Sequence, residues 1–214
     1  MNHRFPSRSW GVVLGLGAVW GLAEAGLGLG LKSCASLASG SIMTAAALFF
    51  ISAAWSRTGS MAAVPVLLLI GGGFKLFDAW LLSLPVRGGA VANPLFAFVA
   101  EAVAFVLVFS LGRAAWRSRP LGQALLGGGV ALLAVGVFPL VRFFTGIAAC
   151  VMPGTSTPLA WHFGPLAVGL SLLTVPLGVW AGTKLDLGRV RLGFLAVPGT
   201  IAACLALMVL LRLA

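Results

Sequence analysis

The sequence lacks the polar residues that a water-exposed surface requires. Charged residues make up 8% of its 214 positions and tyrosine is absent, whereas about a quarter of an ordinary soluble domain is charged. A chain that is 60% hydrophobic could not cover a globular surface with polar groups, but a surface that faces lipid needs no such cover. The composition therefore excludes an ordinary soluble domain and predicts an integral membrane protein in contact with the lipid bilayer.

Few residues are available for catalysis or metal binding. The three cysteines form no CxxC pair, and His162 has only His3 as a second imidazole, so the sequence offers no zinc or haem ligand set. The small-residue stretch Ser39–Ser41 lacks the nearby histidine that a catalytic serine needs. We therefore expect no catalytic residues, no metal site and no cofactor.

The formal charge of +10 does not indicate a nucleic-acid partner. The basic residues lie in short connections between apolar segments, whereas a nucleic-acid interface needs a solvated basic patch with interleaved aromatic residues. Positive charge in short loops is what fixes the orientation of a membrane protein. We expect no nucleic acid among the partners.

Seven apolar segments are long enough to cross a bilayer. They are Trp10–Leu31, Ser36–Trp55, Met61–Leu84, Leu95–Leu111, Leu121–Thr145, Trp161–Ala181 and Leu192–Leu213. We predict an all-α polytopic bundle of about seven transmembrane helices, which forms a single transmembrane domain over residues 1–214. The alternative for the first segment is a cleaved signal peptide. The alternative for the second is a re-entrant segment, which would leave six spanning helices and reverse the side of every later segment.

Arginine and lysine predict the orientation of the bundle. With the amino terminus inside, nine basic residues fall on the inner side: Arg4, Arg8, Arg57, Arg113, Arg117, Arg119, Lys184, Arg189 and Arg191. Three fall outside: Lys32, Arg87 and Arg212. Cytoplasmic loops carry the basic excess, so we predict a multi-pass protein of the cell inner membrane with a cytoplasmic N-terminus and a periplasmic C-terminus. Cys34 and Cys150 then lie at outer ends, where oxidising conditions permit a disulfide.

Five ionisable residues fall inside the predicted helices, where a charge costs at least about 2.5–3.5 kcal/mol on insertion scales. They are Glu24, Lys75, Asp78, Glu101 and Arg142. At about 1.5 Å per residue, the three acids lie roughly 9–10 Å below the outer helix ends and the lysine roughly 14 Å. We interpret this clustering as a polar cavity that opens outward and binds a solute, with His162 as a further polar member. The alternative is a set of structural ion pairs that hold the bundle together.

Helical spacing predicts how these charges pair. Lys75 and Asp78 are three residues apart and share one face of a helix, so they are placed to pair locally. Glu101 and Arg142 have no such local partner. We therefore expect a Glu101–Arg142 pair between helices.

The stretch Leu84–Phe105 (LPVRGGAVANPLFAFVAEAVAF) and the gross plan of the chain resemble the substrate-binding subunits of energy-coupling-factor transporters. Those subunits are small, very apolar bundles of about six helices that bind a vitamin or a metal near the outer face. The resemblance implies a solute-binding protein with other membrane or ATPase subunits as partners. It does not carry over the nickel or cobalt site of some members, because His3 follows Asn2 and lies on the predicted inner side.

The sequence thus predicts an integral membrane solute-binding or transport protein with a charged cavity in the outer half of the membrane. Because the cavity carries charges of both signs, we expect a small polar or zwitterionic solute. The second hypothesis is a non-catalytic accessory subunit of a larger membrane complex. The third is a membrane enzyme acting on a lipid, with Glu24 or Glu101 as base; the lack of a recognised catalytic constellation places it last.

Overall fold

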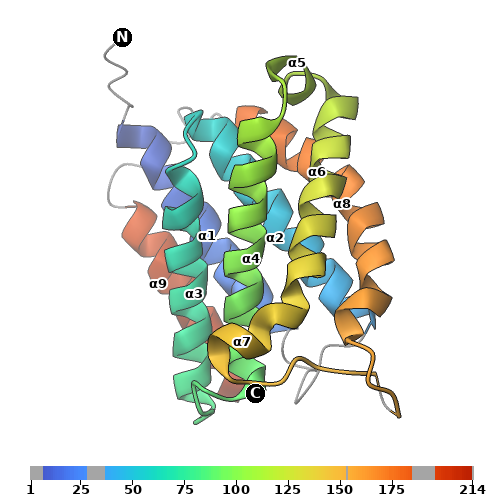
Figure 1. The fold of residues 1–214 in the computed structure, drawn as a ribbon. Coiled ribbons are helices and arrows are strands. Elements are labelled where there is room, and N and C mark those ends of the chain that lie inside the picture. The colour runs from blue at the N-terminus through green and yellow to red at the C-terminus, as the bar shows by residue number, and fades with distance from the viewer. Residues whose placement is uncertain (1–6, 28–36, 153, 185–195, 214) are drawn as a thin grey trace.

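Seven long helices form the bundle, and three short helical elements connect or extend them (Figure 1). The computed structural model describes residues 7–27, 37–152, 154–184 and 196–213. The long helices are α1 (Ser7–Leu27), α2 (Leu37–Thr58), α3 (Ala63–Leu81), α4 (Gly89–Leu111), α6 (Pro120–Val137), α8 (Leu159–Lys184) and α9 (Ala196–Leu213). The short elements are α5 (Ala114–Arg117), the 3₁₀ turn η2 (Phe138–Leu140) and α7 (Val141–Thr145). The described residues include no strand, so the predicted all-α fold with about seven helices is confirmed.

The long helices alternate in direction along the chain. Figure 1 shows α1, α3, α6 and α9 running from the end of the bundle that carries α5 toward the end that carries α7, while α2, α4 and α8 run the opposite way. We call these two ends the α5 end and the α7 end. The first and last helices therefore enter and leave the bundle at opposite ends, as the sequence predicts for an odd number of crossings.

Two helix boundaries differ from those expected. Helix α4 begins at Gly89, six residues before the predicted Leu95, and continues through Pro94. The segment predicted as one helix over Leu121–Thr145 is instead broken by η2, which contains Pro139. Proline lacks the N–H of the helical ladder and its ring collides with the preceding turn, so the chain changes direction there. Arg142 consequently sits on the short helix α7.

In the part of the chain that the structure describes, four helical segments are long and apolar enough to cross a membrane: Ala63–Leu81, Gly89–Leu111, Pro120–Thr145 and Leu159–Lys184. Shorter apolar stretches lie in α1 and α9, over Trp10–Gly26 and Val197–Arg212. Large apolar side chains lie exposed on the outside of these helices, among them Leu69, Leu111, Leu132 and Leu173. Water would disfavour so much exposed leucine, whereas lipid accommodates it. The molecule is a membrane protein with an apolar outer surface.

Helix α2 lies inside the bundle and packs most extensively on α8. It is one continuous helix of 22 residues. Ser52 and Ser56 donate hydrogen bonds to the carbonyl oxygens of Val175 and Val179 on α8, at 3.3 and 3.1 Å. A helix buried by its neighbours needs fewer lipid-facing side chains, which explains the modest hydropathy of this segment.

Glycines on α8 allow this close approach. A Cβ added at Gly178 would meet Ser52 Oγ and the Phe49 carbonyl oxygen, and one at Gly182 would meet the matching groups of Ser56 and Ala53. The Gly178–Gly182 spacing is a small-xxx-small pattern, which brings helix backbones together in lipid. Here the pattern serves packing within the chain.

The α5 end of the bundle is filled by aromatic side chains. Phe105 and Phe109 stack with ring centroids 4.1 Å apart, and Trp55 contacts both rings. Both phenylalanines are completely buried. This half of the interior is therefore a packed apolar core, in contrast to the half near α7.

Candidate functional site

A cavity of about 120 Å³ lies in the half of the bundle toward the α7 end. Its walls come from the parts of α1, α2, α3, α4, α6 and α8 that are nearest this end. The lining residues are Glu24, Gly40, Met43, Thr44, Lys75, Gly89, Ala90, Asn93, Pro94, Ala97, Phe98, Glu101, Ala134, Val135, Phe138, Cys150, Leu159 and Phe163. Most of these are apolar, so the few polar side chains are set in an apolar wall.

Three of the six residues predicted for the site meet at this cavity. Glu24 on α1, Lys75 on α3 and Glu101 on α4 all line it, with 1%, 9% and 3% of their surfaces exposed. The charge of Lys75 acts on Glu24, and that of Glu24 acts on Glu101. Within the described residues, however, neither glutamate forms an ion pair with Lys75. The three charges are near one another without neutralising each other by contact.

Hydrogen bonding leaves several of the polar atoms in this wall unused. The Thr44 hydroxyl hydrogen-bonds to the Glu101 carboxyl group, yet Oε2 of Glu101 has no partner among the described residues. Both carboxyl oxygens of Glu24 and the side-chain oxygen of Asn93 are likewise buried without a partner there. The Trp20 indole N–H, one turn before Glu24, interacts with this carboxyl group, although the contact falls short of hydrogen-bond geometry. Buried polar groups are normally satisfied, so this concentration in one wall is unusual.

Asp78 is buried but does not line the cavity, and its partner is not the one that spacing suggests. Both of its carboxylate oxygens accept hydrogen bonds from Arg212 on α9, from Nε at 2.7 Å and Nη2 at 2.9 Å. The same Nη2 also donates to the Ala25 carbonyl oxygen of α1 at 3.1 Å. This bidentate pair holds α3, α9 and α1 together in place of the expected Lys75–Asp78 pair.

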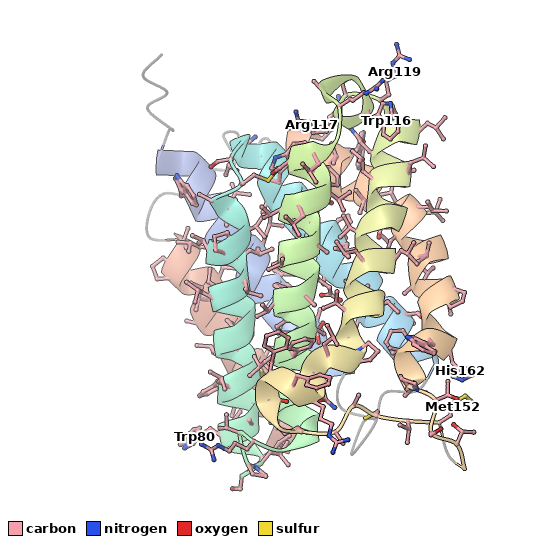
Figure 2. The ribbon with its side chains drawn as sticks, in the orientation of Figure 1. Trp80, Trp116, Arg117, Arg119, Met152 and His162 are labelled. Carbon is pink, nitrogen blue, oxygen red and sulfur yellow. The ribbon has the colours of Figure 1, made fainter. Side chains whose placement is uncertain are left out.

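Arg142 and His162 lie outside the cavity, at the α7 end. Arg142 is exposed on α7 and makes no ion pair with Glu101 in the described part of the chain, because the break at Pro139 carries it away from the bundle interior. His162 is exposed on the first turn of α8, and Figure 2 shows it near Met152 at the rim of the bundle. The expected Glu101–Arg142 pair is therefore not formed.

A wider depression adjoins the cavity at the α7 end. It is lined by residues of the α3–α4 connection, including Leu84 and Pro85, and by Ala148–Val151. Asn93 and Cys150 line both spaces, and Asn93 Nδ2 donates to the Cys150 sulfur at 3.7 Å. These two residues thus stand between the outer depression and the inner charges.

Cys150 is disulfide-bonded, and Cys204 is a buried free thiol. Cys34 lies outside the described residues, so the predicted Cys34–Cys150 pairing stays a prediction. Lys32 is outside them as well.

Three polar residues at or near this site were not among the predicted set. Thr44 looks like one more small residue in an apolar helix, and Asn93 falls in a segment expected to be a loop. In the sequence, Arg212 serves as a marker of orientation, and spacing assigns Asp78 to Lys75. No local spacing links Arg212 to Asp78, because the two residues are 134 positions apart on different helices.

No known protein family, curated protein or solved structure matches the chain.

Proposed function

We propose that this chain is an inner-membrane protein that binds a small polar solute in the cavity between α1, α2, α3, α4, α6 and α8, as a transporter or the binding subunit of one. The observation that carries the proposal is the meeting of Glu24, Lys75 and Glu101 at one cavity without ion pairing among them. Buried ionisable groups are costly in a membrane protein and mark solute or ion pathways.

The Asp78–Arg212 pair supports this assignment by contrast. It shows what a structural ion pair looks like in this chain: two hydrogen bonds join the partners, and both side chains are at least nine-tenths buried. A chain that used charge only to hold its helices together, as an accessory subunit would, needs no more than such pairs. The unpaired groups at the cavity favour a ligand.

The orientation proposed for the protein places this cavity toward the periplasm. Among the described residues in connections and terminal helical turns, the basic side chains at the α5 end are Arg57, Arg113, Arg117, Arg119 and Lys184, and those at the α7 end are Arg87, Arg142 and Arg212. Figure 2 labels two of the first group beside Trp116. Basic residues collect on the cytoplasmic side, so the α5 end is the cytoplasmic one and the aromatic core at Phe105 and Phe109 separates the cavity from it.

A ligand screen tests the proposal. Purified protein in detergent is scanned for thermal stability against a library of small polar solutes, and a binder at a hundredfold excess over its Kd should raise Tm by roughly 5–10 °C. Glu101→Gln should remove that shift. The control, Arg142→Gln, changes an exposed charge outside the cavity and should keep it. A folded wild-type protein that responds to nothing in a broad library would instead favour the accessory-subunit hypothesis.

A further inference from the structure

The polar atoms at the cavity are biased toward acceptors. Both oxygens of Glu24, Oε2 of Glu101 and Oδ1 of Asn93 are buried without a hydrogen-bond partner among the described residues. The Asn93 amide nitrogen is engaged, since it donates to the Cys150 sulfur at 3.7 Å. The ammonium group of Lys75 is the one charged donor in this lining. Four acceptor atoms therefore lack a hydrogen bond from the described part of the protein.

The charges at the cavity are biased in the same direction. With Asp78 neutralised by Arg212, the lining holds two carboxyl groups against one ammonium group. Glu24 and Glu101 are close enough for one charge to act on the other. When both are ionised, the cavity carries one uncompensated negative charge in an apolar setting, which is strongly unfavourable unless a cation or a proton joins it.

The remaining lining residues determine the size and the polarity of the ligand that the cavity accommodates. Met43, Pro94 and the rings of Phe98, Phe138 and Phe163 face the cavity. A cavity of about 150 Å³ with apolar walls accommodates benzene, so 120 Å³ admits a molecule of about six heavy atoms. Aromatic faces also attract cations when both are desolvated. The walls suit a short hydrocarbon body attached to a positively charged head.

A divalent metal ion suits these walls poorly. Within the described residues no group of three or more histidine, cysteine or acidic side chains is placed to hold a metal. Lys75 adds a positive charge to the same wall, which would repel such an ion.

Resting on the proposed function, we infer that the cavity binds a small organic ammonium ion: a primary amine whose N–H groups meet the free oxygens of Glu24, Glu101 and Asn93 and whose hydrocarbon part lies against the phenylalanine rings. The amine brings three donors and one positive charge. Its N–H groups therefore satisfy the unpaired acceptor oxygens, and its positive charge neutralises the excess negative charge of the cavity. Entry is from the depression at the α7 end, past Asn93 and Cys150.

The test compares isosteric probes on the wild-type protein. Butylamine and isopentylamine, which have five and six heavy atoms, are measured at neutral pH by thermal shift and isothermal titration calorimetry, beside 1-butanol, isopentyl alcohol and butyrate. We expect the amines to stabilise the protein, and the alcohols and butyrate to bind at least tenfold more weakly. Alcohols that match the amines would show that hydrophobic partition explains the effect and would overturn the inference.

Variants then locate the binding. Glu24→Gln and Glu101→Gln should each weaken amine binding at least tenfold, while Arg142→Gln should leave it unchanged. Should a glutamine variant fail to fold, the comparison of wild-type probes still decides the question. Unchanged amine affinity in both folded glutamine variants would overturn the inference.

The two proposals fail in different ways. If neither amine binds but butyrate or another library solute does, the amine inference is wrong and the binding function stands. If neither amine nor any library solute binds, both proposals are wrong.

Discussion

Arg212 and Asp78 form the strongest ionic contact in the described part of the chain. The guanidinium fork meets both carboxylate oxygens and also a backbone carbonyl of α1. Arginine is suited to this task because its planar group binds a carboxylate at two points and does not lose its proton. Removing one partner would leave the other buried and charged.

Asp78→Asn and Arg212→Gln should therefore each destabilise the protein by about 3–5 kcal/mol, which is typical when one member of a buried pair is removed. Unfolding free energies measured by denaturant titration in detergent check this. The double variant should recover part of the loss, because no uncompensated charge remains. The exposed Arg142→Gln should stay within about 0.5 kcal/mol of wild type. Strictly additive losses in the double variant would contradict the pairing.

The sequence predicted the cavity charges better than it predicted their partners. Counting residues along helices placed Glu24, Lys75 and Glu101 at neighbouring depths, because helical rise is constant. Partner choice depends also on how each helix is rotated and tilted, which one sequence does not reveal. For that reason Asp78 was assigned to nearby Lys75, whereas its partner is Arg212, 134 positions away.

At the scale of single elements, the contact between α2 and α8 is the most extensive among the described helices. Ser52 and Ser56 of α2 face Gly178 and Gly182 of α8 with the same four-residue step. The two helices run in the same direction, so each turn repeats the contact made by the previous one. Such packing compensates for the weak hydrophobic drive between helices in lipid.

Gly178→Ala should destabilise the protein by about 1–3 kcal/mol, the usual cost of overpacking, because its new Cβ would collide with the Phe49 carbonyl oxygen and the Ser52 hydroxyl. Gly169→Ala on the same helix is the matched control, since a Cβ there meets nothing within 4 Å. It should leave stability equal to wild type or raise it by up to about 1 kcal/mol. Both are compared by thermal unfolding. Equal losses for the two variants would show that the α2–α8 contact is not tight.

The structural feature that the sequence predicts least well is the end of the segment Leu121–Thr145, which is expected as one helix. Pro139 was visible, but a proline within a long apolar run can either kink a membrane helix or end it. Here it separates α6 from α7, and the consequence for the site is large because Arg142 leaves the bundle interior. The early start of α4 has a related cause: Pro94 suggests a helix boundary in the sequence, yet it is accommodated in the second turn of the helix.

At the scale of the whole molecule, the two ends of the bundle differ in charge and in packing. The α5 end has most of the described basic side chains and a solid aromatic core, and the α7 end has the cavity and its adjoining depression. The sequence anticipated this asymmetry through its loop charges, although the shape of the cavity depends on side-chain packing across six helices.

Cysteine labelling in intact cells checks the proposed orientation. His162→Cys at the α7 end should react with a membrane-impermeant maleimide, because the proposed orientation places that end at the periplasm. Arg119→Cys at the α5 end should react only after the membrane is permeabilised. Both positions are exposed, so accessibility within the protein does not differ between them. Wild-type protein gives the background from native thiols, and the reverse labelling pattern would invert the orientation.

The 134 positions between Asp78 and Arg212 also set a waiting time during biosynthesis. At about 5–20 residues per second, the ribosome needs roughly 7–27 seconds to make the arginine after the aspartate. During that interval α3 has already been synthesised without its countercharge. The buried pair therefore forms only when the last helix has been made and packs against α3 and α1.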